Sequence, residues 1–204
     1  MNQPRLPKRE RTRRRLLDAG VRVLAERGDA LTASDVVAEA DVSNGTFYNH
    51  FLDREDFIEN LARESIAAIA SGSAADTEGE DPAWRFAVAS TRVLVVAVRQ
   101  PLWGLAILRL AQRPNSPHDN IQQHLRADLA EGHRLGRFSH GDDPVTVDLV
   151  AGTLMASLRR LVSTNTNVDD VGVSAVVARL LEALGVENGE ARSLAIAAFE
   201  AERP

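Results

Sequence analysis

The sequence predicts an all-α fold of about ten helices. Apolar residues recur at helical spacing along almost the whole chain. Proline, glycine and capping residues separate these stretches at the points where helices would start and stop. The one valine-rich run that could form a strand, Leu94 to Val98, continues a longer helical pattern of apolar residues. No segment therefore favours a strand.

The first two helices follow from one apolar face and one capping box. Apolar residues on a single helical face run from Leu16 to Leu24, and Gly28 can end that helix. Thr32 begins the second helix, because Asp35 stands three residues further on and can complete a capping box. This second helix is expected to run to about residue 40.

Two more helices follow after a tight turn. Asp41 occupies that turn, and aspartate tolerates a positive φ better than most residues. Ser43 can cap a third helix that runs to about residue 51 and turns Phe47 and Phe51 inward. The fourth helix is expected over about residues 53–70.

Prolines and polar stretches divide the rest of the chain into six helices. The polar stretch over residues 71–81 predicts a loop, and Asp81-Pro82 restarts the helical pattern. The six helices are expected over about residues 82–100, 102–112, 117–135, 144–162, 171–184 and 188–202.

Charge is distributed unevenly along the chain. Seven basic residues and one acidic residue in positions 1–15 give this segment a net charge of +6. The remaining 189 residues carry 17 basic and 28 acidic groups, a net charge of −11. A basic segment on an acidic body suggests that a polyanion binds at one end only. The alternative is a solvated, disordered tail.

Several functional classes find no support in the sequence. The 204 residues include no cysteine, which excludes disulfides, thiol catalysis and thiolate metal sites. No apolar run approaches the ~20 residues that span a bilayer, and the basic start lacks the apolar core of a signal peptide. The five histidines do not pair at metal-ligand spacing, and no phosphate loop or nucleophile elbow is present. We therefore expect a soluble, cytoplasmic protein without metal, cofactor or membrane association that is not an enzyme.

Residues 32–51 have the spacing of a helix-turn-helix. Two short helices are joined by a turn of about four residues, and the preceding helix braces them. The outer positions of the second helix are small or polar, and none is acidic. A helix that enters a DNA major groove needs hydrogen-bonding groups on its outer face and no carboxylate facing phosphate. The segment therefore predicts a recognition helix.

From about Arg11 to Leu61 the chain resembles the DNA-binding domain of the TetR family of bacterial transcriptional regulators. The resemblance is densest over residues 42–51, which read Val-Ser-Asn-Gly-Thr-Phe-Tyr-Asn-His-Phe, and continues in Asp-Arg-Glu-Asp-Phe at 53–57. It covers about a quarter of the chain. Asp41 replaces the family's usual turn glycine, and Arg54 stands where relatives usually have lysine.

The resemblance implies that nine residues contact operator DNA. Residues at the start of the recognition helix would face the bases, and Tyr48 and His50 would meet phosphates or base edges. Thr32 and Arg54 would bind phosphate from the starts of their helices. Thr32 and Ser43 both cap and contact DNA in this interpretation, whereas Tyr48 could simply pack and His50 could have no role. The nine are Thr32, Ser43, Asn44, Gly45, Thr46, Tyr48, Asn49, His50 and Arg54.

The resemblance also implies two domains: residues 1–56 as a helix-turn-helix DNA-binding domain with its basic arm, and residues 57–204 as a helical effector-binding and dimerisation domain. The helix over 144–162 supports dimerisation independently, because Gly152 and Ala156 lie one turn apart and would allow close helix approach. The helix over 171–184 offers an apolar stripe of valines and leucines for the same interface. The alternative is that both are core helices of a monomer.

An effector pocket is expected among the middle helices. For each candidate the alternative is an ordinary core or surface position, because apolar stripes at helical spacing are usually core. The apolar candidates are Trp84, Phe86, Trp103, Ile107, Leu125 and Met155, and the polar anchors are Arg109, His124 and Arg159.

The leading hypothesis is a DNA-binding transcriptional repressor that binds a palindromic operator in double-stranded DNA as a homodimer and is released by an unknown small-molecule effector. The alternative is a DNA-binding regulator controlled by a protein partner without a small-molecule ligand. A third class is an enzyme or carrier that uses the apolar domain. An enzyme would need a reactive constellation, and the sequence has none.

Overall fold

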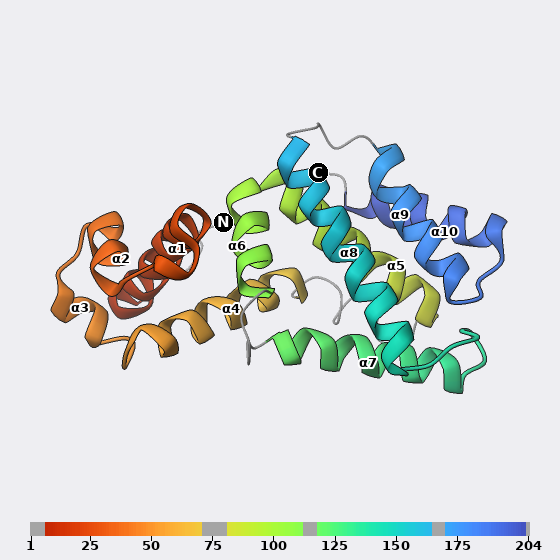
Figure 1. The fold of residues 1–204 in the computed structure, drawn as a ribbon, viewed down its shortest axis with the longest axis horizontal. Helices are drawn as coiled ribbons and strands as arrows, with labels where there is room; N and C mark the ends of the chain where they lie inside the picture. The colour runs from red at the N-terminus through yellow and green to blue at the C-terminus, as the bar shows by residue number, and fades with distance from the viewer. Residues whose placement is uncertain (1–6, 71–80, 112–117, 165–169, 203–204) are drawn as a thin grey trace.

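The computed structural model describes residues 7–70, 81–111, 118–164 and 170–202 (Figure 1). These residues form ten α-helices, one short 3-10 helix and no strand, which confirms the all-α prediction. The predicted loop over 71–80 lies outside the described residues. The α-helices are α1 Lys8–Arg27, α2 Ala33–Ala40, α3 Asn44–Tyr48, α4 Arg54–Ala70, α5 Pro82–Arg99, α6 Pro101–Ala111, α7 His118–Arg134, α8 Pro144–Thr164, α9 Asp170–Ala183 and α10 Asn188–Ala201, and the 3-10 helix is Gly28–Ala30.

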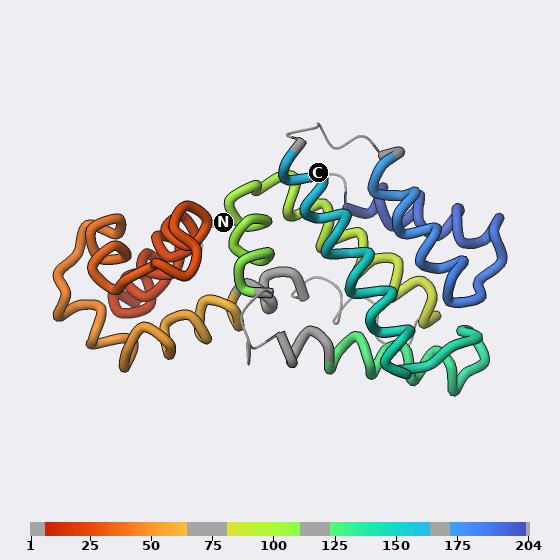
Figure 2. Tube along the Cα trace, in the orientation of Figure 1, coloured from red at the N-terminus to blue at the C-terminus, as the bar shows by residue number. Residues whose placement is uncertain are grey.

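The helices are arranged in a small group and a larger group (Figure 1). The helices α1, α2 and α3 form one end of the molecule, and α4 leads from them toward the larger group. The trace in Figure 2 shows α6 standing between the two groups. In the larger group α5 is packed against α7, α8, α9 and α10.

The larger core is built around α5. Its residues Phe86, Leu94 and Val95 are buried together with apolar residues of α7 to α10. The valine and leucine stripe of α9, which sequence analysis offered as a dimer interface, is buried in this core of a single protomer. That part of the interface prediction is wrong, because helical periodicity identifies a buried face without showing whether it packs inside the chain or against a second one.

The smaller core is built from three phenylalanines that pack ring against ring. Phe47, Phe51 and Phe57 are each at most 2% exposed, and their ring centroids lie 4.9–5.4 Å apart. Gly20 lets α1 approach this cluster, because a Cβ at that position would lie 2.3 Å from Cζ of Phe57. The cluster therefore fixes α3 and the start of α4 against α1.

The helix α6 contributes to both cores. Its residues Ala106 and Leu110 are buried in the smaller core, and Trp103 packs against that core as well. Its residues Ile107 and Leu108 are buried in the larger core. The two groups of helices are thus joined through the two apolar faces of one helix as well as through α4.

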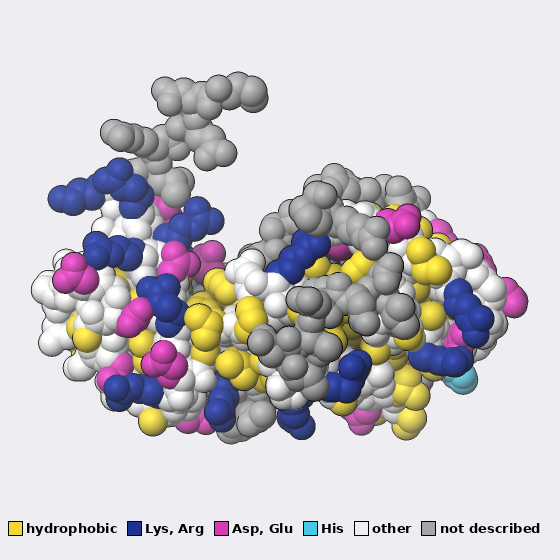
Figure 3. Space-filling view, turned by 90° about the horizontal axis from the view of Figure 1, so that it is seen from above, with side chains coloured by type: hydrophobic (Ala, Val, Ile, Leu, Met, Phe, Trp, Pro, Cys, Tyr) yellow, Lys and Arg dark blue, Asp and Glu magenta, His cyan; other side chains and the backbone are white. Residues whose placement is uncertain are grey.

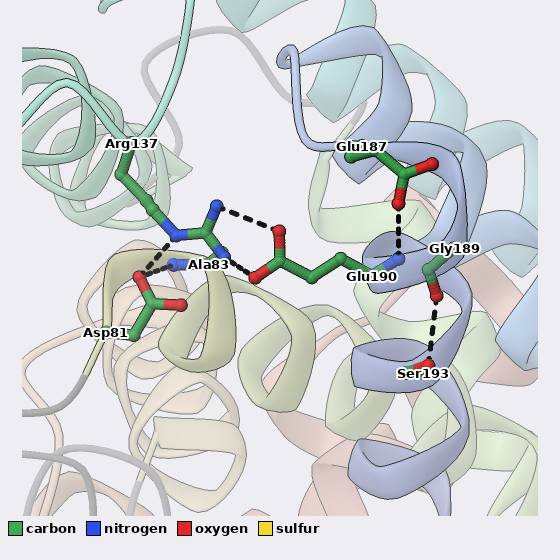
Figure 4. A network of polar contacts seen from close by, with 7 residues as sticks. All are labelled: Asp81, Ala83, Arg137, Glu187, Gly189, Glu190 and Ser193. Atoms are coloured by element: carbon green, nitrogen blue, oxygen red, sulfur yellow. Dashed lines mark hydrogen bonds and ion pairs between the residues drawn. The ribbon is translucent and has the colours of Figure 1, made fainter.

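A polar network closes the larger group at the end where α5 and α10 begin (Figure 4). Nε of Arg137 donates to Asp81 at 2.7 Å, and both terminal nitrogens donate to Glu190. Burial opposes the ionisation of Asp81, but hydrogen bonds from Arg137 and from the backbone of Ala83 outweigh it and lower the pKa of Asp81. Arg137 therefore ties the loop after α7 to the first turns of two other helices.

Across the described ranges, no single helix is long and apolar enough to cross a membrane, although α5 and α6, bent by 118° at their junction, pass on length and composition when taken as a pair.

Candidate nucleic-acid interface

The start of α2 is organised by a reciprocal capping box. The hydroxyl of Thr32 accepts a hydrogen bond from the backbone N–H of Asp35 at 3.1 Å, and the carboxylate of Asp35 accepts from the backbone N–H of Thr32 at 3.0 Å. The hydrogen bond from the Thr32 side chain lowers the pKa of Asp35, so the carboxylate is charged at neutral pH. The predicted cap is thus present, and the first N–H groups of α2 lie at an exposed helix end.

The turn between α2 and α3 places the recognition helix. Asp41 adopts the left-handed conformation with φ 50° and ψ 56°, as predicted for that turn. Ser43 then caps α3, because its hydroxyl accepts a hydrogen bond from the backbone N–H of Thr46 at 3.3 Å and lies 2.9 Å from the Thr46 hydroxyl. The helix α3 ends at Tyr48, three residues earlier than expected from the aromatic spacing. Phe51 nevertheless reaches the buried cluster from the segment that follows.

The outer face of α3 is open to solvent. Ser43, Asn44, Gly45 and Asn49 are exposed, and Thr46 is half-buried. The side chain of Tyr48 is 60% exposed, and its ring packs edge-on against buried Phe47 with 5.4 Å between ring centroids. The sequence-predicted residues of this helix are therefore brought together on one accessible surface, while the phenylalanines face the opposite way.

His50 joins this surface to the start of α1. Burial lowers the pKa of His50, and the charges of Arg9 and Arg13 lower it further. The neutral form of the imidazole is therefore favoured, and the charges of Arg9 and Arg13 act on it. Arg13 is itself held in place, because it donates to Glu64 at 2.8 Å and to Asn60 at 3.0 Å and lies 5.8 Å from the ring centroid of Phe51.

The basic residues of α1 divide into paired and unpaired groups. Arg15, Arg22 and Arg27 form ion pairs with Asp41, Glu39 and Asp35 of the α2 region at 2.5–3.4 Å. No ion pair within the described ranges involves the exposed side chains of Lys8, Arg9, Arg11 and Arg14. In Figure 3 basic side chains gather at the end of the molecule that α1 to α3 form, interspersed with acidic ones. The cations available for DNA are thus at the start of α1, and Arg5 of the predicted arm lies outside the described residues.

Arg54 is placed differently from the other predicted contacts. Its side chain is 30% exposed and turns toward the segment between α1 and α2. Nε donates to the carbonyl of Leu31 at 2.7 Å, and a terminal nitrogen donates to the carbonyl of Asp29 at 2.6 Å. The other terminal nitrogen pairs with the carboxylate of Glu55.

The predicted effector residues fall into two places. Phe86 and Ile107 are buried in the larger core, and Trp84, Leu125 and Met155 are partly buried against it. Trp103 is separated from them, because it packs against the smaller core. The side chains of Arg109, His124 and Arg159 are exposed, and that of Arg109 lies against Gly28 at the end of α1.

A partly buried carboxylate on α7 escaped the sequence analysis. Burial raises the pKa of Asp128, and the neighbouring charges come from Arg85, Glu131 and His124. Such a group among helices of a binding domain is a candidate polar contact for a ligand. The sequence signal was the spacing of His124 and Asp128, one helical turn apart. No group of three or more potential metal ligands gathers among the residues that the structure covers.

Two open surfaces of the larger group are an exposed strip of α8 and a groove between α9 and α10. On α8, Val145 is 74% and Leu149 45% exposed, Ala156 is exposed, and Gly152 has no atom within 4 Å of where its Cβ would be. The groove has a volume of about 470 Å³. Its lining residues are Ser174, Ala175, Ala178, Arg179, Glu182, Arg192, Ile196, Phe199 and Glu200.

Comparisons with known proteins extend this description to the whole chain. The family model for bacterial regulatory proteins of the tetR family matches residues 16–61, and the model for the tetracyclin repressor-like C-terminal domain matches residues 81–197. None of the curated proteins matches the chain at a significant level.

Solved structures share the fold over nearly the full length. RolR in complex with the ligand resorcinol is 27% identical, with a TM-score of 0.67 over 97% of this chain and 96% of that one. A gamma-butyrolactone receptor described as ArpA-like is 22% identical, with a TM-score of 0.67 over 95% and 100%. FadR from Bacillus subtilis in complex with stearoyl-CoA is 20% identical, with a TM-score of 0.70 over 85% and 99%.

The two family models together cover the helix-turn-helix and most of the larger group of helices, and the second model alone matches more than half of the chain. The proteins that these models describe are transcriptional regulators rather than enzymes. The chain belongs to the TetR family of bacterial transcriptional regulators.

Proposed function

We propose that this regulator is a repressor that binds a palindromic operator as a homodimer and is released when a small molecule binds its C-terminal domain. The observation that carries the DNA-binding half is the exposed, non-acidic face of α3, which is flanked by the unpaired cations of α1. A helix end with free N–H groups, that of α2, borders the same surface. We keep residues 1–56 and 57–204 as the two functional domains.

The proposed DNA contacts are of two kinds: contacts to phosphates, which position the protein on the duplex, and contacts to base edges, which read the sequence. Cations and helix N-termini bind phosphates, which fixes the orientation of the protein on the duplex. We assign this role to Thr32, to the start of α1 and to His50. The small and polar residues of α3, with Tyr48, are the groups that can reach base edges in the major groove.

A homodimer is supported by the surface of α8 as well as by the DNA-binding half. One recognition helix reads few base pairs, so two half-sites a helical turn or a multiple apart need two copies. The strip of Val145, Leu149, Gly152 and Ala156 is apolar or small, and it lies outside the protomer's own core. Because α9 packs against α8, its outward residues and the groove beside them can extend the same interface.

A small-molecule effector is supported by similarity to a ligand-binding regulator and by the side chains of the larger group of helices. RolR, with 27% identity over 97% of this chain, has been solved with resorcinol bound. The partly buried Trp84, Leu125 and Met155 and the carboxylate of Asp128 provide apolar and polar groups for such a ligand. The alternative, control by a protein partner, differs in that no small molecule would be retained by the purified protein. Native mass spectrometry of the full-length protein separates the two.

Tyr48 should contribute to operator binding without contributing to folding. Tyr48 is 60% exposed, so Tyr48→Ala should weaken binding to a duplex that the wild-type protein selects from random DNA by roughly 30-fold, about 1 kcal/mol in each half-site. Tyr48→Phe is the matched control, because it keeps the edge-on packing against Phe47. An equal loss in both variants, measured by fluorescence anisotropy, assigns the contact to the hydroxyl. Unchanged affinity in Tyr48→Ala would remove this residue from the interface.

His50 should make operator binding dependent on pH. A phosphate beside the imidazole raises its pKa, whereas in the free protein burial and two arginines hold that pKa below 6.5. Binding then takes up protons, so affinity should fall as pH rises from the pKa of the free protein to the higher pKa of the complex, and His50→Gln should remove this dependence. His140→Gln, an exposed histidine in the loop before α8, should leave it intact. The same pH dependence in wild type and His50→Gln would refute the contact.

Gly152→Leu should separate dimerisation from folding. Open space surrounds this position in the protomer, so the substitution should not disturb the protomer's core, but it should prevent close approach of two α8 helices. Sedimentation at micromolar concentration should show a dimer for wild type and a monomer for the variant. Ala130→Leu on the exposed face of α7 is the control. A wild-type monomer would contradict the dimer and the palindromic operator together.

A true effector should weaken operator binding, and operator DNA should weaken effector binding by the same factor. Coupling free energies of ~1–3 kcal/mol predict a roughly 5- to 150-fold loss of operator affinity, and an equal loss of effector affinity when operator is bound. Small phenols such as resorcinol are the first compounds to titrate, since RolR provides the precedent. A compound that binds tightly yet leaves operator affinity unchanged occupies the domain without being the signal.

A further inference from the structure

We infer that Arg54 is a positioning residue for operator binding: its guanidinium clamps the turn between α1 and α2 to the start of α4 and thereby sets the N-terminus of α2, instead of binding phosphate itself. This inference rests on the proposed function and concerns how its DNA-binding surface is held. It departs from the role that sequence resemblance implied for this position.

The evidence for the clamp is the set of hydrogen bonds that the Arg54 guanidinium donates. All three nitrogens of Arg54 have acceptors: two backbone carbonyls, those of Leu31 and Asp29, at 2.7 and 2.6 Å, and the carboxylate of Glu55. Each of the three nitrogens is thus already engaged, and a phosphate would have to share the guanidinium with partners that are in place. The neighbouring carboxylate of Glu55 would also repel the phosphate.

The position of the two carbonyls gives the clamp its effect. Asp29 lies in the 3-10 helix that follows α1, and Leu31 is buried directly before Thr32, the cap of α2. Fixing both carbonyls therefore fixes the main chain one residue before the helix end whose N–H groups face solvent. Arginine suits this task because its planar fork donates in two directions at once, which the single ammonium of lysine cannot reproduce.

The same turn is held from a second side. Gly28 has φ 56°, a conformation that favours glycine, and the side chain of Arg109 from α6 lies 3.5–3.6 Å from where its Cβ would be. Leu110, one residue further on, is buried in the smaller core. Arg54 from α4 and Arg109 from α6 both contact the turn between α1 and α2. The turn is therefore expected not to move with α1 alone, and the start of α2 keeps its position relative to α4.

Salt dependence distinguishes a clamp from a phosphate contact. We would measure the affinity of the full-length protein for its selected duplex at several salt concentrations, for wild type, Arg54→Lys and Arg54→Gln. A clamp predicts that both variants lose affinity to a similar extent, roughly five- to tenfold, because neither can bridge the two carbonyls. It also predicts that the salt slope stays at the wild-type value, because no phosphate contact is lost. Arg9→Gln, which removes an exposed cation of α1 whose charge acts on His50, serves as the comparator for a lost phosphate contact.

A direct phosphate contact by Arg54 predicts a different and equally specific result. A direct phosphate contact predicts that Arg54→Lys retains wild-type affinity, while Arg54→Gln loses affinity and flattens the slope by about 0.9 for each half-site. That result, or unchanged affinity in both variants, would overturn the inference. A wild-type protein that selects no duplex would instead count against the proposed function.

Hydrogen exchange tests the clamp without DNA. In the free protein, Arg54→Lys should speed amide exchange in the peptide that spans residues 28–40, and it should leave exchange in α9 and α10 as in wild type. A variant that only weakened folding would raise exchange throughout the chain. Unchanged exchange over residues 28–40 would refute the clamp even if operator affinity had fallen.

Discussion

The DNA-binding end of this protein depends on apolar side chains of α6 that complete its hydrophobic core. A segment of about 60 residues buries only ~60% of the surface that its unfolded chain exposes, which leaves little stability to spare. Here Ala106 and Leu110 complete a core that α1 to α4 leave open, and Trp103 covers its edge. Because Ile107 and Leu108 of the same short helix belong to the larger core, the two ends of the molecule share one rigid element.

This sharing gives the proposed coupling a physical route. The helix α4 carries Phe57 into the smaller core and continues toward the larger group of helices, so it is one link between them. The structure adds α6, which contacts both α1 and the turn before α2. A ligand that moves α6 would therefore act directly on the smaller core, and a ligand that moves α4 would act on the turn through Arg54. Because close-packed interiors have low compressibility and transmit strain, a displacement of either helix would be passed on to the proposed DNA-binding surface.

Local signals in the sequence were sufficient for the helices and their caps. The pairing of Thr32 with Asp35, the hydroxyl of Ser43 and the left-handed Asp41 each depend on neighbours within a few residues, and each is present in the structure. Among the proposed DNA contacts, the same local reading put the residues of α3 on one open face. Its aromatic spacing overestimated the length of that helix, because Phe51 reaches the core from a turn rather than from another helical residue.

What the sequence could not show are contacts made across the fold. Trp103 was expected with the other pocket candidates of the middle helices, but only the placement of α6 decides which of two cores receives it. In the same way, the apolar stripe of α9 proved to be core of one protomer, and the family pattern at Arg54 could not indicate that two carbonyls 23 and 25 residues earlier in the chain would meet its guanidinium. Each of these depends on a tertiary neighbour for which the local sequence carries no signal.

The sequence shows how many basic residues the start of the chain has, but only the fold shows which of them form ion pairs. Counting residues makes the start of the chain strongly basic, yet Arg13 and Arg15 are engaged with acceptors on α4 and at the α2 turn. Such surface pairs add little stability but hold their side chains in fixed places. The cations left for a polyanion are those of the first turns of α1, beside His50 and next to the exposed face of α3. Since the remainder of the chain is net acidic, the proposed DNA contact is favoured at this end of the molecule, where the unpaired cations of α1 lie.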